Sequence, residues 1–360
     1  MGPVRLFSLI VMGLSGLSGQ AVAEAVTYPA PDGSTRVQVV VYSTLDQPLA
    51  APLIAGFQAQ HPDVTVRYED LLADQIATRV RAETDAGGPS ADFVFSSAMD
   101  VQMKLANDGY AQPVALRRDW PVWARWQDMA YALTLEPAVV VYHKPSFPDG
   151  PPQSRLAILD WLAALPKTGA PRVGTYDIAA SAVGYLFMAR DADRFPDVWG
   201  MLAAMARAGL QTYPTSQDII DRVADGRLLL GYNILGSYAA DQARVRPDLG
   251  LVLLRDYTVV ISRVGLVPRA AARPDLGRDL LAWLASDAGQ TVLSDRLRLP
   301  SVSLGVTDAG GEGSLSGLGA GLQPVPVSPG VMAYLDQANR ARLLRTWAAA
   351  LSGDAAALAR

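Results

Sequence analysis

The chain has 360 residues, of which 50% are hydrophobic and 18% are charged. This composition argues against a disordered chain, and the length suggests about two domains of roughly 150 residues. The net charge of −4 and the lack of a basic run make nucleic-acid binding a poor hypothesis, and the absence of cysteine excludes disulfides, thiolate metal sites and cysteine nucleophiles.

Residues 1–23 have the form of a secretory signal peptide. Arg5 provides the positive start, residues 6–17 form an uncharged apolar run, and Ala21-Val22-Ala23 is typical of a cleavage site. A membrane anchor is the alternative, but the apolar run is too short to cross about 30 Å of hydrocarbon. We therefore predict cleavage after Ala23. Because the chain has no cysteine to carry a lipid, we expect a free protein located in the periplasm.

Strand and helix patterns alternate after a Pro- and Gly-containing stretch, residues 24–35, which predicts an exposed lead-in. Runs of β-branched residues predict buried strands, and apolar residues spaced by three or four predict helices. These signals place strands at 37–42, 64–68 and 92–95, and helices after Asp46, at 71–83 and at 100–107. The βαβαβ order predicts a parallel sheet with helices on both faces.

A second α/β region begins at residue 133. Strands are predicted at 133–142, 172–176, 228–232, 249–254 and 257–267, and helices at 154–165, 181–189, 198–208, 217–224, from 237, at 274–285, 287–295 and 331–351. We interpret this order as two lobes joined by at least two crossings. Lobe 1 is predicted to comprise 24–132 plus 256–360, and lobe 2 to comprise 133–255. A cleft between two such lobes is the favoured place for a ligand.

The residues of common catalytic sites are missing. His61 lies in a helix-to-strand turn and His143 follows a strand, so each is better interpreted as a loop residue than as a base or a metal ligand. No nucleophile elbow, zinc-protease motif or phosphate loop occurs. Glu69 and Asp70 are adjacent and point to different faces, which argues against an acid–base dyad. We predict a protein that is not an enzyme and needs no cofactor; an enzyme on the same fold is the alternative.

Hydroxyl groups follow two neighbouring strands of the first region. Ser43 and Thr44 come after the first strand, and Ser96 and Ser97 come after the third; each pair precedes a helix. Hydroxyls and unpaired N–H groups at a helix start suit an anion. Helix capping is the alternative for either pair alone. Because both pairs lie at the carboxyl ends of strands, we predict that they converge on one site.

Two further turns in lobe 2 join a strand to a helix. Asp177 and Ser181 occupy the first turn, and Asn233, Ser237 and Tyr238 occupy the second. Glycines in the second turn would let the backbone approach a ligand closely. Where the chain is expected to recross between lobes, Arg255-Asp256-Tyr257 supplies one more candidate contact, Tyr257. Arg255 could bind an acidic ligand, and an interlobe ion pair is its alternative role.

Extended stretches of the chain resemble the type 2 periplasmic solute-binding proteins of ABC transporters, in the branch with ferric-iron, sugar-phosphate and phosphonate binders. The resemblance is carried by VVVYSTLDQPLAAPLIAGFQAQHPDVTV, ADFVFSSAMDVQMKLANDGYAQP, EPAVVVYHK, GTYDIAASAVGYLF, GRLLLGYNILGSYA and RDYTVVISRVGLVPRAA. It implies an α/β fold of two lobes, each a mainly parallel sheet flanked by helices, joined by hinge strands that let the lobes close over a ligand. It also implies a monomer that delivers its ligand to a permease and an ATPase.

The resemblance leaves the ligand and the partner open. Ferric-iron members use an adjacent pair of tyrosines, whereas this chain has Gly236-Ser237-Tyr238 with a single tyrosine. Hydroxyls and helix starts suit a small organic or phosphorylated anion better than Fe³⁺, which is kept as an alternative ligand. The same pattern also resembles binding proteins that serve a membrane sensor kinase, including the phosphoglycerate transport regulatory type. Sensing is therefore the alternative to transport.

Overall fold

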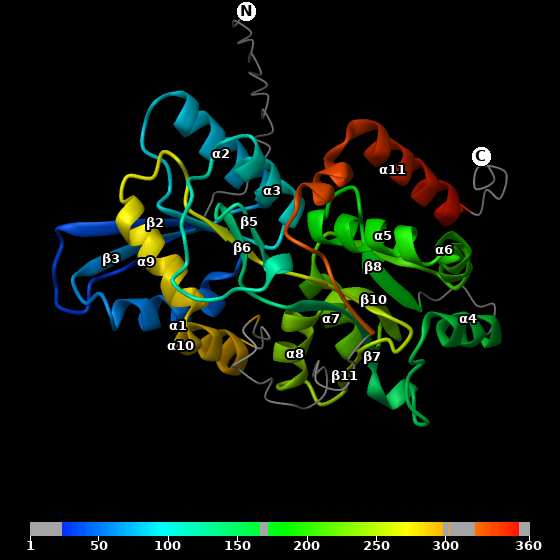
Figure 1. Ribbon diagram of the computed structural model, residues 1–360. Coiled ribbons are helices and arrows are strands. Elements are labelled where there is room, and N and C mark those ends of the chain that lie inside the picture. Colours follow the sequence, from blue (N-terminus) through cyan, green and yellow to red (C-terminus); the bar gives the residue numbers. More distant parts are fainter. Residues whose placement is uncertain (1–23, 166–171, 298–301, 303–320, 353–360) are drawn as a thin grey trace, which may run out of the picture.

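The computed structural model describes residues 24–165, 172–297, 302 and 321–352. These residues form two β-sheets, each flanked by helices, that lie side by side (Figure 1). We call each sheet with its helices a lobe. The predicted signal peptide, residues 1–23, lies outside the described residues. Among the helices that are described, none is both long and apolar enough to cross a membrane.

The first lobe has the strand order β1-β3-β2-β4-β13-β6-β5. Its strands are β1 (Glu24–Tyr28), β2 (Val37–Ser43), β3 (Val64–Asp70), β4 (Phe93–Ser96), β5 (Arg125–Trp126), β6 (Ala130–Ala132) and β13 (Val264–Leu266). Its helices are α1 (Gln47–Gln58), α2 (Ala73–Asp85), α3 (Met99–Asn107), η1 (Val122–Ala124), α9 (Pro274–Ala285), α10 (Asp287–Thr291) and η3 (Val292–Arg296). Strand β2 is parallel to β3 and β4, which confirms the predicted βαβαβ unit.

Helix α1 shows how the sequence determines the helices that cover the first-lobe sheet. Pro48 stands in its first turn, where the missing N–H costs nothing because a helix start leaves that donor unpaired. Leu53, Ile54 and Phe57 share one face and are at most 5% exposed, so the helix buries this face in the core of the lobe. The helix therefore begins at the end of β2, on the rim where the predicted hydroxyls lie.

The expected lead-in, residues 24–35, is mostly exposed, and its first five residues form an edge strand. Strand β1 pairs antiparallel with β3, with Tyr28 opposite Val66. Gln58, buried in α1, donates hydrogen bonds from Nε2 to the carbonyls of Tyr28 (3.2 Å) and Pro29 (3.0 Å). The sequence pattern did not indicate this strand, because its contacts come from a helix about 30 residues away.

The second lobe has the strand order β14-β12-β7-β10-β8-β9, and β11 also pairs with β7. Its strands are β7 (Glu136–His143), β8 (Val173–Tyr176), β9 (Gln211–Tyr213), β10 (Leu230–Leu235), β11 (Leu249–Val252), β12 (Thr258–Ile261) and β14 (Leu322–Pro324). Its helices are η2 (Lys144–Ser146), α4 (Arg155–Ala164), α5 (Ala182–Arg194), α6 (Val198–Arg207), α7 (Ser216–Ala224) and α8 (Gly236–Ala243). Strand β8 is parallel to β9 and β10. Helix α5 follows the carboxyl end of β8.

The chain crosses between the lobes at two described places. The first crossing lies between β6 and β7, at residues 133–135, and the second lies between β12 and β13, at Ser262 and Arg263. Strands β7 and β12 pair antiparallel, with Ile261 opposite Glu136. The recrossing therefore follows β12, whereas the sequence pattern placed it at Arg255-Asp256-Tyr257.

The C-terminal segment also differs from the predicted division, which assigned 256–360 to lobe 1. Strand β14 pairs with β12 of the second lobe, and α11 (Gln337–Ser352) packs against α6. Trp347 and Ala350 of α11 lie in the core of the second lobe, at 6% and 0% exposure. The short helix η6 (Pro329–Leu335), between β14 and α11 in the chain, packs against α3 of the first lobe. The amphipathic pattern of a helix predicts that it packs, but does not predict which lobe it packs on.

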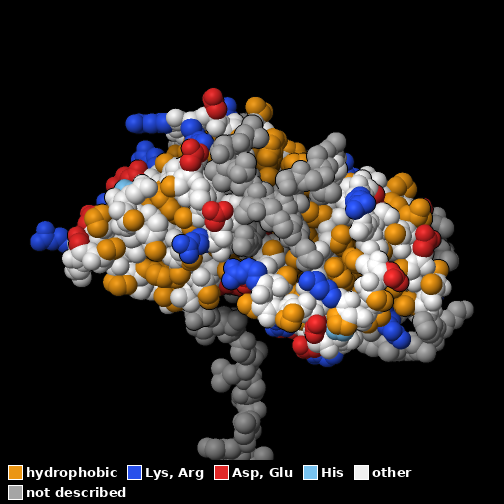
Figure 2. Space-filling model, turned by 90° about the horizontal axis from the view of Figure 1, so that it is seen from below, with side chains coloured by type: hydrophobic (Ala, Val, Ile, Leu, Met, Phe, Trp, Pro, Cys, Tyr) orange, Lys and Arg blue, Asp and Glu red, His pale blue; other side chains and the backbone are white. Residues whose placement is uncertain are grey.

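The face of the molecule in Figure 2 carries lysine and arginine side chains that are dispersed among acidic and hydrophobic ones. The described residues do not form a single basic patch on this face. A surface that binds nucleic acid gathers its positive charge along one face or stripe. This face therefore offers no electrostatic footprint for a nucleic acid.

Candidate functional site

A cavity of about 660 Å³ lies between the two lobes. The first lobe contributes residues that follow β2, β3 and β4, and the second lobe contributes the starts of α5, α7 and α8. Its polar side chains are Thr44, Asp46, Asp70, Asp74, Ser97, Asp100, Tyr176, Ser181, Tyr185, Thr215, Ser216, Gln217, Tyr238, Arg263 and Arg340. A cavity of this size suits a small organic molecule.

The structure brings together four of the residues predicted from sequence. Thr44 and Ser97 line the first-lobe wall, and Ser181 and Tyr238 line the second-lobe wall. The backbone N–H of Ser97 donates to Thr44 Oγ1 over 3.2 Å, so the turns that follow β2 and β4 are directly linked. The turns that follow β2 and β4 therefore lie next to each other on the first-lobe wall, as the sequence predicted.

The other six predicted contacts do not line the cavity, and their side chains hydrogen-bond to other groups of the protein. In the first lobe, Ser43 Oγ donates to the carbonyl of Phe95 over 2.7 Å. Ser96 Oγ accepts the N–H of Ala98 over 3.2 Å. Both side chains are 1% exposed or less. These hydroxyls hold the turns that follow β2 and β4. Helix capping, their alternative role, is not what they do, since α1 and α3 have no side-chain cap hydrogen bond.

Four second-lobe residues are engaged in the same way. The Asp177 carboxylate accepts the N–H of Ala179 over 2.9 Å, and Ser237 Oγ donates to Glu136 Oε2 over 2.9 Å. Asn233 and Tyr257 both donate to the buried carboxylate of Asp191. These hydrogen bonds fix the turn before α5, the start of α8 and the strands behind the cleft. We therefore leave all four out of the proposed ligand contacts.

The second-lobe wall joins two helix starts at one tyrosine. The Tyr176 hydroxyl, at the end of β8, lies 2.5 Å from Ser216 Oγ at the start of α7. Ser181 caps α5 by accepting the N–H of Gly184 over 3.2 Å. The N–H groups of Ala182 and Val183 have no acceptor among the described residues, as is usual for the first turn of a helix. This wall presents unpaired donors and the positive ends of two helix dipoles to the cavity.

The first-lobe wall carries the opposite charge. Asp46 precedes α1, and Asp74 and Asp100 lie in the first turns of α2 and α3, where negative side chains balance the helix dipoles. Across the cleft from Asp46 stands Tyr238 of α8. Burial raises the pKa of Tyr238 above its usual range, and the charges of Asp46 and Glu136 add to this increase against that of Arg263. Tyr238 therefore remains a hydrogen-bond donor at physiological pH.

Asp100 is the most buried of the cleft carboxylates, at 3% exposure. Its Oδ1 accepts the N–H of Val101 over 2.9 Å. Burial raises the pKa of Asp100 to about 6, although that hydrogen bond and the charge of Arg340 act in the opposite direction. A carboxylate that is charged at this position lowers the stability of the folded chain.

We expect Asp100→Asn to stabilise the protein at pH 8 by on the order of 2–3 kcal/mol and to have little effect at pH 3. The pKa of Asp100 is higher in the folded chain than in the unfolded chain. The stability that its protonated form contributes is therefore present below pH 4 and is lost as the pH rises through about 6. Urea unfolding at both pH values measures the difference. A matched control is Asp108→Asn at the end of α3, because Lys104 lowers the pKa of that carboxyl; an equal gain in both variants would contradict the assignment.

The described residues contain no group of three or more His, Asp or Glu side chains that could hold a metal ion. Ser216 and Arg263 are among the site residues that sequence reasoning did not single out. Arg263 left one usable signal, since it is the only charged residue in the apolar run 258–267. Ser216 left none, because only the parallel pairing of β8 with β9 brings the start of α7 next to Tyr176.

Comparisons with known proteins agree with this architecture. A family model described as bacterial extracellular solute-binding protein matches residues 37–296. The solved substrate binding protein of the ABC transporter from Agrobacterium tumefaciens is 52% identical, with a TM-score of 0.85 over 92% of this chain and 100% of that chain. No curated protein sequence matches significantly.

Two more distant solved structures share the fold alone. Iron-bound HitA from Pseudomonas aeruginosa is 14% identical, with a TM-score of 0.69 over 87% of this chain and 99% of that chain. AfuA from Actinobacillus pleuropneumoniae, with fructose-6-phosphate bound, is 14% identical, with a TM-score of 0.68 over 88% and 99%. The predicted two-lobed type 2 periplasmic-binding fold is confirmed.

Proposed function

The chain belongs to the family of bacterial extracellular solute-binding proteins, and we propose that it captures a small anionic solute between its lobes without altering it. Like the Agrobacterium tumefaciens protein, which serves an ABC transporter, it passes the solute to a membrane permease driven by an ATPase. It does so in the periplasm, after cleavage of the signal peptide following Ala23. Closure of the lobes is stabilised by ligand contacts on both walls.

The proposal of an anionic ligand is supported by the hydrogen-bond donors of the second-lobe wall. The N–H groups of Ala182 and Val183, the Ser181 hydroxyl and the Ser216 hydroxyl all lie at helix starts beside Tyr176. Helix α5 has no acidic residue in its first turn. The donors and the dipole of α5 are therefore available to a negatively charged group of the solute.

Thermal unfolding in the presence of single compounds tests this function. The screen contains organic acids, sugar phosphates, phosphonates, neutral sugars and Fe³⁺, with the purified mature chain. A ligand at about 100 times its Kd adds about 2.7 kcal/mol to the stability of the folded state. We expect at least one organic or phosphorylated anion to raise Tm. A rise with Fe³⁺ or with neutral sugars, and none with any anion, would contradict the proposal.

We expect Ser181→Ala to weaken binding of that anion about fivefold or more, because one hydroxyl next to the ligand is lost. Isothermal titration calorimetry measures the Kd. The matched control is Ser154→Ala. Ser154 caps α4 in the same way, accepting the N–H of Ala157 over 3.1 Å, but it does not line the cavity. Each variant should lose about 1 kcal/mol of stability, and equal affinities in both would remove Ser181 from the site.

A further inference from the structure

A buried arginine lies at the floor of the cleft, at the point where the chain recrosses between the lobes. Arg263 stands between β12 and β13, and its side chain is 1% exposed. Its Nε lies 2.9 Å from Glu136 Oε1, and its Nη1 donates to Thr44 Oγ1 over 3.2 Å. Nε is within ion-pair distance of Glu136 but makes no hydrogen bond in the part of the chain that the structure describes. The guanidinium thus lines the cavity with donor capacity that the protein leaves unused.

The partners of Arg263 come from both lobes and from the first crossing. Glu136 opens β7 just after the first crossing, is 0% exposed and also accepts the hydroxyl of Ser237 over 2.9 Å. Thr134, within the first crossing, accepts the N–H of Arg263 over 2.8 Å. Because these groups lie where the strands pass between lobes, an opening of the lobes moves them little compared with the rims. The charge of Arg263 therefore stays at the floor of the cleft in open and closed states.

Acidic side chains outnumber basic ones around the cavity, so binding of an anion depends on the few cations there. Four aspartates line the cavity, at positions 46, 70, 74 and 100, against two arginines. The second arginine, Arg340, stacks over the ring of Tyr185 at 4.6 Å and donates to the carbonyl of Ala179 over 3.3 Å. A buried charge acts through a low dielectric and is felt more strongly than an exposed one. Of the two cations, Arg263 is the buried one at the floor.

We propose that Arg263 is the residue that makes the cleft select anions, and that Glu136 limits the strength of this selection by pairing with it. The inference rests on the proposed function, since it concerns the same cleft and an anionic solute. A neutral ligand would not need a guanidinium at the floor. Without Glu136 the full charge of Arg263 would face the solute, and with Glu136 only part of it does.

The two members of the pair therefore have opposite effects on affinity. Arg263→Gln removes the cation and leaves the carboxylates, so the Kd of the anion found in the screen should rise about 30-fold or more. Glu136→Gln leaves an uncompensated cation, so the Kd of the same anion should fall about threefold or more. Both variants should unfold at a lower temperature without ligand, because each leaves a buried charge unpaired. A purely structural role would lower both stability and affinity in both variants.

Isothermal titration calorimetry measures the Kd of the anion from the screen. Four forms of the mature chain are compared: wild type, Arg263→Gln, Glu136→Gln and Arg340→Gln. Circular dichroism checks that each is folded. If Arg263→Gln does not fold, Arg263→Lys takes its place and should bind at least about threefold more weakly, because a lysine cannot reach both Glu136 and the ligand. Arg340→Gln is the control and should change the Kd less than Arg263→Gln does.

The outcomes separate this inference from the proposed function. If no anion binds the wild type, the proposed function fails, and selection of anions by Arg263 fails with it. If an anion binds the wild type and Arg263→Gln binds it equally well, the function stands and the role of Arg263 is overturned. Weaker binding by Glu136→Gln overturns the limiting role of Glu136, since the pair would then act only as a structural connection between the crossings.

Discussion

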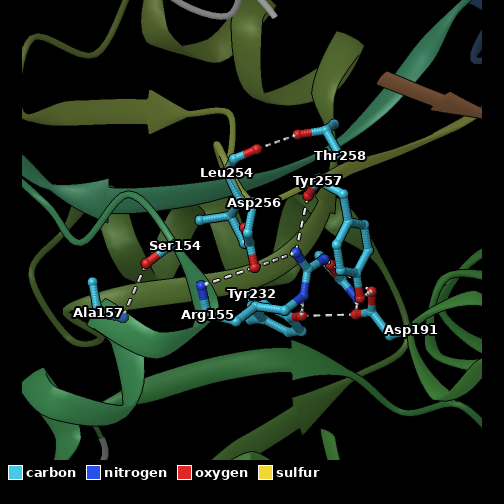
Figure 3. A network of polar contacts seen from close by, with 10 residues as sticks. Ser154, Arg155, Ala157, Asp191, Tyr232, Leu254, Asp256, Tyr257 and Thr258 are labelled. Carbon is cyan, nitrogen blue, oxygen red and sulfur yellow. Dashed lines mark hydrogen bonds and ion pairs between the residues drawn. The ribbon is translucent and has the colours of Figure 1, made fainter. Parts of the chain in front are cut away.

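Replacing Asp191 by alanine is expected to lower the free energy of unfolding by about 3–5 kcal/mol. Asp191 of α5 is 0% exposed and lies beside Arg155, Tyr232 and Tyr257 (Figure 3). Its carboxylate accepts four hydrogen bonds. Oδ1 accepts from Arg155 Nη2 (2.9 Å) and from the Tyr257 hydroxyl (2.8 Å). Oδ2 accepts from the Tyr232 hydroxyl (2.7 Å) and from Asn233 Nδ2 (2.6 Å).

The loss is large because Arg155 is buried with Asp191. The side chain of Arg155 is 1% exposed, and without Asp191 its only other carboxylate within ion-pair distance among the described residues is Asp256, at 3.2 Å. Burial raises the pKa of Tyr257 above its usual range, and the charge of Asp191 raises it further, so this hydroxyl stays a donor with no acceptor in the variant. Uncompensated buried charge and unpaired donors are the costly outcome of breaking such a network.

Urea unfolding followed by circular dichroism measures the change. The matched control is Asp225→Ala, which breaks an ion pair of similar length, 2.8 Å, with Arg227. The side chains of Arg227 and Asp225 are 57% and 55% exposed. That variant should change stability by less than about 1 kcal/mol. A loss in Asp191→Ala no larger than in the control would show that the network contributes little.

The second large effect is expected for Gly184→Ala, which should lower stability by about 1–3 kcal/mol and weaken anion binding. A Cβ at Gly184 would lie 2.2 Å from the Cβ of Tyr176, far inside van der Waals contact. The first turn of α5 must therefore move away from Tyr176. Because Ser181, Ala182 and Val183 belong to that turn or precede it directly, their donors move with it, and we expect a Kd raised about tenfold.

Gly200→Ala in α6 is the control for this substitution. A Cβ at Gly200 meets no atom within 4 Å, so the methyl group introduces no clash. Alanine is the better helix former, and the variant should gain about 0.5–1 kcal/mol with an unchanged Kd. Urea unfolding and titration calorimetry measure both variants. Wild-type stability and affinity in Gly184→Ala would show that the contact with Tyr176 does not position the wall.

The sequence was sufficient for features that depend on neighbouring residues. The β-branched run at 37–42 and the apolar spacing after Asp46 predicted β2 and α1, and the alternation of strands and helices predicted the two-lobed fold. The hydroxyls of Ser97 and Ser181 were recognised because polar residues between a strand and a helix lie at the carboxyl edge of a sheet. These are local patterns, and the backbone geometry that follows from them is local too.

Only the tertiary structure decided which polar residues face the solute. Ser43 and Ser97 occupy similar turns, yet Ser43 is used by Phe95 and Ser97 lines the cavity. Asn233 and Tyr257 resembled ligand contacts until the fold brought Asp191 between them. The pairing of Arg263 with Glu136 and the position of α11 on α6 likewise join residues more than 100 positions apart. Contacts across such separations depend on how whole sheets and helices pack, and no pattern of adjacent residues encodes them.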